Sequence, residues 1–110
     1  MMLDKISTCL KEIECVELRK DTAGKYYEAV FLQSKIPSIM QTLESSLGKP
    51  IPRANFTPLI EKTISEYGGV GDGQTLYFLK QDKEILFAML WPWQSGQFTT
   101  IKLATKTTSV

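Results

Sequence analysis

Histidine is absent from this chain of 110 residues, and arginine is scarce, with Arg19 and Arg53 as the only two. Histidine is the one side chain whose ordinary pKa lies near neutral pH, so a general base would have to be a carboxylate, a lysine or a cysteine. An excess of one charge is also missing, because thirteen basic residues face twelve acidic ones. DNA- and RNA-binding proteins usually carry a basic excess, so we expect no nucleic-acid partner.

Cysteine is nearly absent too, and Cys9 and Cys15 predict neither a metal site nor a redox motif. Their six-residue separation places them neither on one helix face nor in a Cys-x-x-Cys pattern. We interpret them as small core residues, with a redox pair as the alternative. The acidic residues show no metal-ligand spacing, so we expect no metal and no cofactor. No secretory signal is visible in residues 1–13, which predicts a cytoplasmic protein.

Long apolar runs are lacking, and the longest one covers the seven residues from Ile85 to Trp91. It is too short to cross a bilayer and has the length of a buried strand, so we expect no membrane partner. Successive residues of a strand point to opposite faces of its sheet, and this run is apolar at both sets of positions. The run therefore predicts a central strand that is covered on both faces.

Three helices are predicted from the spacing of apolar residues. The first covers residues 3–14. The second is opened by Pro37 and a Ser38 capping box and ends at Gly48. The third starts at Thr57, followed by a proline, and ends at Gly68.

Strands are predicted where β-branched and aromatic residues gather between turn signals. These segments are a strand around Val16 and Leu18 and further strands over residues 26–32, 75–80, 85–91 and 98–104. Residues 15–20 have a competing interpretation as a continuation of the first helix, which would leave four strands. Residues 1–104 then form a single domain, and residues 105–110 form a flexible C-terminal tail.

The elements follow the order α-β-β-α-α-β-β-β, which predicts an α+β fold with a five-stranded, or alternatively four-stranded, antiparallel sheet. The order resembles that of PAS-like and profilin-like domains by topology alone. That resemblance implies that the two middle helices cover one face of the sheet. The N-terminal helix or another chain would then cover the second face, because monomers rarely expose an apolar patch of several hundred Å². We therefore expect a homodimer or a complex with another protein.

A glycine-rich segment follows the third predicted helix. Such loops bind phosphate when they lead from a strand into a helix N-terminus, whereas this one leads from a helix into a strand. We interpret it as a helix end followed by a mobile turn. The alternative is a ligand-gating flexible loop formed by Gly69, Gly71, Asp72 and Gly73.

Trp91 and Trp93 flank Pro92 and project to the same side if the backbone is extended. Rigid aromatic surfaces of this kind recur at protein interfaces and in ligand pockets. A pocket between the sheet and the middle helices would be lined by Tyr67, Phe78 and Trp91. The alternative is that Trp91 completes the core and Trp93 covers the end of the sheet.

Three functions follow from these residues, and none of them is specified by a motif. The first is a non-enzymatic protein-interaction module that self-associates or docks a partner through its sheet face. The second is a small-molecule sensor or ligand-binding domain with a pocket between sheet and helices. The third is a small enzyme that uses an isolated carboxylate, such as Asp72 or Glu28, or Cys15. No catalytic constellation is visible in the sequence.

Overall fold

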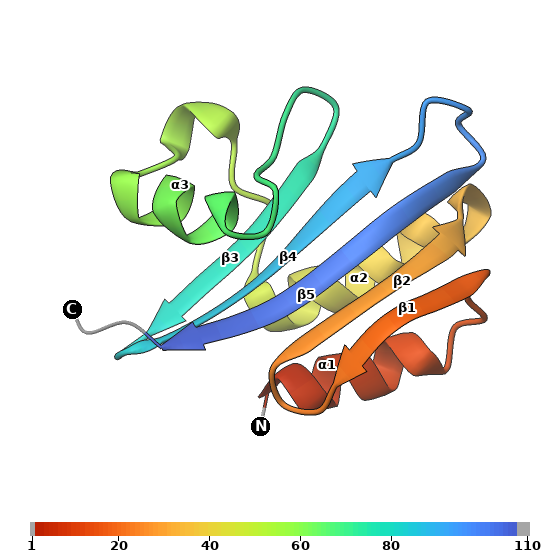
Figure 1. The fold of residues 1–110 in the computed structure, drawn as a ribbon, viewed down its shortest axis with the longest axis horizontal. Coiled ribbons are helices and arrows are strands. Elements are labelled where there is room, and N and C mark those ends of the chain that lie inside the picture. The colour runs from red at the N-terminus through yellow and green to blue at the C-terminus, as the bar shows by residue number, and fades with distance from the viewer. Residues whose placement is uncertain (1, 108–110) are drawn as a thin grey trace.

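The computed structural model describes residues 2–107, which form one five-stranded antiparallel sheet and three α-helices (Figure 1). In chain order the elements are α1 (Met2–Lys11), β1 (Glu17–Thr22), β2 (Tyr26–Leu32), α2 (Ile36–Leu47), α3 (Pro58–Ser65), β3 (Thr75–Gln81), β4 (Glu84–Pro92) and β5 (Phe98–Thr107). Two short 3-10 helices, Gln33–Lys35 and Arg53–Asn55, precede α2 and α3. The strands lie side by side in the order β1-β2-β5-β4-β3. The predicted fold class and element order are confirmed, and residues 17–22 are a fifth strand rather than part of the first helix.

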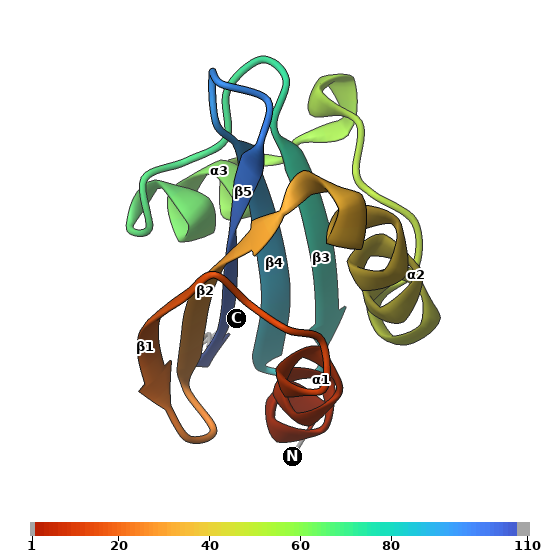
Figure 2. The same ribbon diagram turned by 90° about the vertical axis from the view of Figure 1, so that its right-hand side faces the viewer.

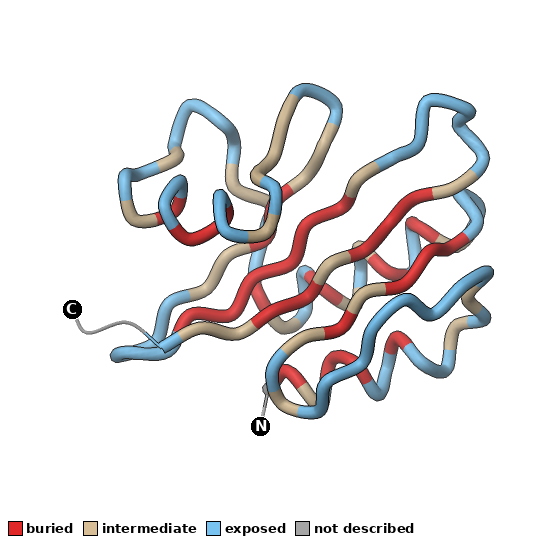
Figure 3. The backbone as a smooth tube through the Cα atoms, in the orientation of Figure 1, coloured by how far each residue is buried: buried red, intermediate tan, exposed pale blue. Residues whose placement is uncertain are grey.

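Strand β4 is buried on both faces, as the sequence predicts. Every residue from Ile85 to Leu90 is buried (Figure 3). Leu86, Ala88 and Leu90 belong to the core under α1 and α2, whereas the alternate residues of the strand belong to the core under α3. Burying one large aliphatic or aromatic side chain contributes about 1.5–3 kcal/mol, so this strand stabilises both halves of the fold.

The two middle helices lie on opposite faces of the sheet, and the expectation that both cover one face is wrong. Helices α1 and α2 pack on one face and α3 packs on the other (Figure 2). Because α3 supplies the second cover of β4, no additional chain is needed there. The argument for a homodimer from a bare sheet face therefore loses its basis.

The chain changes faces by passing around the outer edge of β3. In the loop between α2 and α3, the Ile51 amide donates a hydrogen bond of 2.8 Å to the Leu76 carbonyl of β3. Proline at positions 50 and 52 keeps this loop out of regular structure. The bond also occupies a backbone carbonyl at the edge of β3. Unpaired backbone groups at a sheet edge could otherwise pair with a strand of another molecule and cause aggregation.

The start of α3 follows its predicted signal, whereas the start of α2 does not, and α3 ends at Ser65 rather than at the predicted Gly68. The Thr57 hydroxyl accepts a hydrogen bond of 3.2 Å from the Ile60 amide and caps α3. Gly48 ends α2 with φ of 84°. The Ser38 capping box is wrong, because α2 begins at Ile36 without a side-chain cap and Ser38 lies inside its first turn.

The sheet extends further toward the C-terminus than predicted. Strand β5 continues to Thr107, and Thr107 pairs with Glu84 of β4. Residues 105–107 are therefore part of the sheet and not of a flexible tail, because their backbone groups pair with β4. Residues 108–110, the rest of the predicted tail, lie outside the described residues.

The cysteines are both free thiols. Cys15 is half-buried against the core under α1 and α2. Cys9 is exposed, which corrects its interpretation as a core residue, because it lies on the outer side of α1.

None of the helices within residues 2–107 has the length and apolar character that a membrane crossing requires.

Candidate functional site

Half of one sheet face has no helix over it. On the side where α3 lies in front of β3 and β4, no helix lies over the strands β5, β2 and β1 (Figure 1), although Val30, Thr100 and Ala104 are buried there. Side chains alternate between faces along a strand, so the even-numbered residues of β2 and β5 point to this side. We call this surface the open face and define it by Arg19, Lys20, Tyr26, Glu28, Leu32, Trp93, Phe98 and Lys102.

One end of the open face is apolar. Leu32 pairs with Phe98 across β2 and β5, and the Phe98 ring packs edge-on against Trp93 with centroids 5.1 Å apart. The Trp93 indole donates a hydrogen bond of 2.9 Å to the Thr100 hydroxyl, which fixes the ring. Leu32 is 45% exposed and Trp93 is 39% exposed. We call Leu32, Trp93 and Phe98 the apolar corner, a rigid surface that stays accessible to solvent.

Cations lie over aromatic rings along the rest of the open face. The Arg19 guanidinium lies 5.8 Å from the centroid of the Trp93 ring, and the Lys102 ammonium lies 3.6 Å from the centroid of the Trp91 ring. The Lys20 ammonium lies 6.0 Å from the Tyr26 centroid. Each such contact contributes about 0.5–2 kcal/mol, depending on how far it is shielded from water. Together they hold three positive charges on one surface.

Carboxylates balance only one of these three cations. Arg19 forms an ion pair of 2.9 Å with Glu17 and lies 3.8 Å from Glu28. Glu28 also accepts a hydrogen bond of 2.5 Å from the Tyr26 hydroxyl. Within residues 2–107, no carboxylate lies within 4.0 Å of the ammonium groups of Lys20 or Lys102. The open face therefore carries positive charge without a carboxylate partner.

Lys102 connects the open face to the loop that follows α3. Its ammonium donates a hydrogen bond of 3.1 Å to the Tyr67 carbonyl while it lies over the Trp91 ring. Burial lowers the pKa of Lys102 from its ordinary value, and the nearby Glu28 charge opposes that shift. The side chain thus fixes the border between the covered and uncovered halves of the sheet.

A groove lies at the end of the open face opposite the apolar corner. It has a volume of about 400 Å³, and Tyr26, Tyr67, Glu84 and Lys106 are among the residues that line it. The rings of Tyr26 and Tyr67 stack with centroids 5.7 Å apart. Since β2 has seven residues, the distance from this groove to the apolar corner is about 20 Å. The open face is thus a track that an extended segment of about six residues could follow.

The predicted site residues Tyr67, Phe78 and Trp91 come together on the α3 side of the sheet, where they are half-buried and pack against the core. The Phe87 ring joins two of them, with centroids 5.2 Å from Tyr67 and 6.2 Å from Phe78. Trp91 and Trp93 point to the same face, as their spacing predicts. Trp91 is half-buried, whereas Trp93 is 39% exposed.

The glycine-rich loop forms one wall of a separate pocket of about 140 Å³. Gly71, Asp72 and Gly73 line it, whereas Gly69 does not. The Gln74 side chain accepts a hydrogen bond of 2.6 Å from the Gly71 amide, and the Gln74 amide donates one of 3.2 Å to the Gly71 carbonyl. These two bonds close the turn between Gly71 and Gln74.

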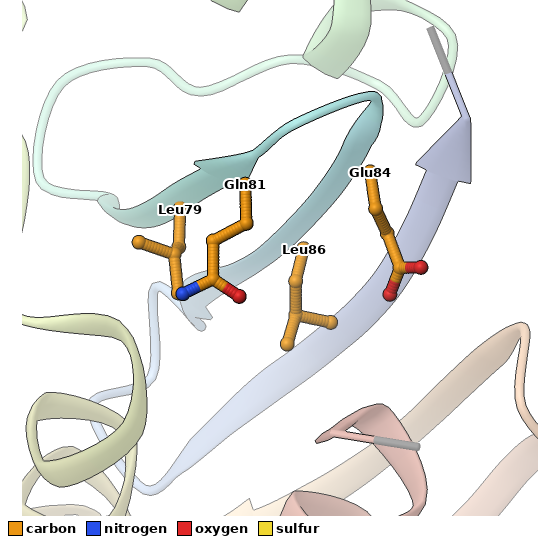
Figure 4. Close-up of a pocket in the computed structure, with 4 residues that line it drawn as sticks. All are labelled: Leu79, Gln81, Glu84 and Leu86. Carbon is orange, nitrogen blue, oxygen red and sulfur yellow. The ribbon is translucent and has the colours of Figure 1, made fainter.

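A smaller pocket lies at the β3–β4 hairpin. Leu79, Gln81, Glu84 and Leu86 point into it from the two strands (Figure 4). Its volume is about 30 Å³, which is room for about one water molecule. It is too small to be a ligand site.

The candidate catalytic residues stand apart from one another. Cys15 lies against the core under α1 and α2, whereas Glu28 is on the open face and Asp72 is in the glycine loop. Within the described part of the chain, no group of three or more cysteine and acidic side chains is placed to hold a metal ion. Glu28 has Tyr26 and Arg19 beside it, and Asp72 has the exposed Arg53 3.7 Å away.

Sequence reasoning missed six residues of the open face: Arg19, Lys20, Tyr26, Leu32, Phe98 and Lys102. Their signal is weak because it depends on β5 lying beside β2, a pairing that neither segment encodes by itself.

The chain matches no protein family, no curated protein and no solved structure. The resemblance to PAS-like and profilin-like domains therefore remains one of element order and gains no further support.

Proposed function

We propose that this chain is a non-enzymatic protein-interaction module whose partner is an extended segment of another protein lying along the open face. The observation that carries the proposal is the apolar corner. Leu32 and Trp93 stay 45% and 39% exposed on a half-sheet that no helix covers. Rigid aromatic side chains with accessible faces are the usual anchors of protein interfaces, because they bury a large area at little entropic cost.

The chemistry of the open face specifies the segment that it would accept. The apolar corner suits one large aliphatic or aromatic side chain. Lys20 and Lys102 have no carboxylate partner within residues 2–107 and would favour acidic side chains further along the segment. Charge complementarity of this kind adds specificity and speeds association. We therefore propose a partner segment with an apolar anchor residue at one end followed by aspartate or glutamate.

Backbone pairing at the β1 edge is a less suitable docking mode. The register between β1 and β2 shifts between Leu18 and Lys20, and all six residues of β1 are exposed. An irregular edge strand with four charged side chains resists the addition of another strand. The proposed segment therefore binds through side chains on the open face.

Self-association receives less support than a separate partner. Helix α3 covers the second face of β4, so a second copy is not required for burial. The apolar corner offers two half-exposed side chains, whereas stable interfaces bury about 800 Å² on each partner. We propose a transient complex with another protein, in the cytoplasm, where the free thiols Cys9 and Cys15 would stay reduced.

A matched pair of substitutions tests the proposal. Random extended peptides are selected by display on the full chain, and the dissociation constant of an enriched peptide is then measured by fluorescence anisotropy. Leu32→Lys places a charge in the apolar corner and should weaken binding at least about tenfold, because it removes the anchor contact. Leu18→Lys is the control, since Leu18 is 53% exposed and faces the other side of the sheet.

Two results would contradict the proposal. One is that selection enriches no peptide. The other is that the enriched peptides bind the Leu32→Lys and Leu18→Lys variants with equal affinity. Sedimentation of the unmodified chain tests whether a second copy of the chain is the partner instead. A concentration-dependent dimer that Leu32→Lys abolishes would show that a second copy occupies the apolar corner.

A further inference from the structure

We infer that the pocket between the glycine loop and the loop that precedes α3 is a second binding site, and that its ligand is a free apolar α-amino acid. The pocket lies beside the outer edge of β3. Its walls come from residues 51–56 on one side and residues 70–76 on the other. No residue of the open face lines it.

The size of the pocket restricts the ligand to one side chain. Its volume is about 140 Å³, close to the roughly 150 Å³ of a dry apolar cavity that accepts benzene and well below the 300 Å³ of a small drug site. Four apolar side chains form its inner surface: Ile51, Phe56, Val70 and Leu76. An aliphatic group of the size found in valine or leucine fits these walls.

Opposite charges lie at the rim of the pocket. The Arg53 guanidinium lies 3.7 Å from the Asp72 carboxylate, and both residues line the pocket. Their side chains are 62% and 106% exposed, so the pair contributes little to stability and can open without much cost. A zwitterion can replace both partners at once, with its carboxylate on Arg53 and its ammonium on Asp72. The combination of an apolar interior with a paired cation and anion at the rim is what an apolar amino acid requires.

The walls are held in place before any ligand binds. Gln74 closes the glycine turn through its two hydrogen bonds to Gly71, at 2.6 and 3.2 Å. On the other side, the Ile51 amide is tied to the Leu76 carbonyl at 2.8 Å. A site that is already ordered loses little conformational entropy on binding. A small ligand that makes few contacts can therefore still bind.

The inference is independent of the proposed protein partner. Leu32→Lys alters the apolar corner and leaves the pocket untouched, whereas changes at Arg53 or Asp72 leave the open face untouched. A failure of amino-acid binding would therefore not affect the peptide result, and the reverse also holds.

The experiment titrates the isotope-labelled full chain with L-leucine and follows the backbone amide signals by NMR. We expect saturable shifts confined to residues 51–56 and 70–76, with a dissociation constant of about 1 mM, as a ligand of about nine non-hydrogen atoms can reach. Two analogues isolate the charges. 4-Methylpentanoate lacks the ammonium and 3-methylbutylamine lacks the carboxylate, so each should bind about tenfold more weakly.

Two variants assign the charges to their residues. Arg53→Gln should weaken leucine binding about tenfold, because the carboxylate loses its partner. Asp72→Asn should weaken leucine binding but strengthen the binding of 4-methylpentanoate, since it removes a repelling charge. Both side chains are exposed, so the rest of the spectrum should stay unchanged. The inference is overturned if leucine produces no saturable shifts, if the shifts lie elsewhere, or if leucine and both analogues bind equally well.

Discussion

Gly68 lies against the ring of Trp91 so closely that a Cβ atom at this position would be 2.5 Å from the ring carbon Cη2. Gly68 also has φ of 101°, a conformation that residues with side chains rarely adopt. The Lys102 ammonium lies over the same ring, 3.6 Å from the ring centroid, and would be 3.7 Å from that Cβ atom. This packing sets where the covered half of the sheet ends and the open face begins.

Replacing Gly68 with alanine should therefore lower the free energy of unfolding by about 2–4 kcal/mol, because backbone strain and a steric clash combine. Gly69→Ala is the matched control, since Gly69 has φ of 74° but nothing within 4 Å of a Cβ atom. It should cost about 1 kcal/mol from the backbone alone. Urea denaturation measures both. Equal losses in the two variants would show that the contact with Trp91 is not what excludes a side chain at Gly68.

The Tyr77 hydroxyl is buried, and within residues 2–107 it has no hydrogen-bond partner. A buried hydroxyl without a partner costs about 1–3 kcal/mol. Tyr77→Phe should therefore raise the free energy of unfolding at pH 7 by about 1 kcal/mol, with the ring packing kept. Thermal and urea unfolding check this. A loss of stability would instead reveal a hydrogen bond that the structure does not contain.

Alkaline pH should unfold the protein through its buried tyrosines. Burial raises the pKa of Tyr27 and of Tyr77 to about 12, from an ordinary value of 10.0. Between these two pH values the unfolded chain releases protons that the folded chain keeps, so stability falls as pH rises, by up to about 1.4 kcal/mol per pH unit for each tyrosine. Lys102 has the opposite effect on stability below pH 10.5. Because burial lowers its pKa, the unfolded chain holds a proton there more readily than the folded chain, and the free energy of unfolding rises with pH.

The measurement is urea denaturation at intervals from pH 8 to pH 12. We expect the free energy of unfolding to hold or rise slightly up to about pH 10 and to fall steeply above it. Tyr77→Phe should reduce the steepness of the fall. An unchanged slope in that variant would mean that Tyr77 titrates normally in the folded protein.

The two predicted helix caps provide a direct comparison. Thr57→Ala removes the hydroxyl that accepts a hydrogen bond from the Ile60 amide and should cost about 1 kcal/mol. Ser38→Ala should stay within about 0.5 kcal/mol of the unmodified chain, because Ser38 lies inside α2 and caps nothing. Both values come from urea denaturation. A larger loss at Ser38 than at Thr57 would contradict the described helix starts.

Elements with strong local signals could be predicted from the sequence. The apolar run from Ile85 to Trp91 identified a strand buried on both faces, because its pattern leaves no polar side for water. Thr57 and Pro58 marked the start of α3 through a hydrogen bond that forms within one turn. Such signals depend on neighbours in sequence, and periodicity and capping rules describe those neighbours well.

The side of the sheet that each helix covers could not be predicted. Periodicity shows that α2 and α3 are amphipathic, but their apolar patterns would be the same whichever face of the sheet they covered. Their placement depends on the path of the connecting loop around β3, which is fixed by the bond from Ile51 to Leu76. The open face was missed for the same reason, since it exists only because α3 lies over β3 and β4 and no helix lies over β1 and β2.

The two tryptophans offer the most direct measurement of the proposed docking surface. The Trp93 indole donates to Thr100 at the apolar corner, whereas the Trp91 indole nitrogen is buried under the open face. Their two indole N–H signals can be followed by NMR while a selected peptide is added. We predict that the Trp93 signal shifts strongly and saturably, together with amide signals of β2 and β5. Shifts confined to α1 and α2, with the Trp93 signal unmoved, would contradict the account.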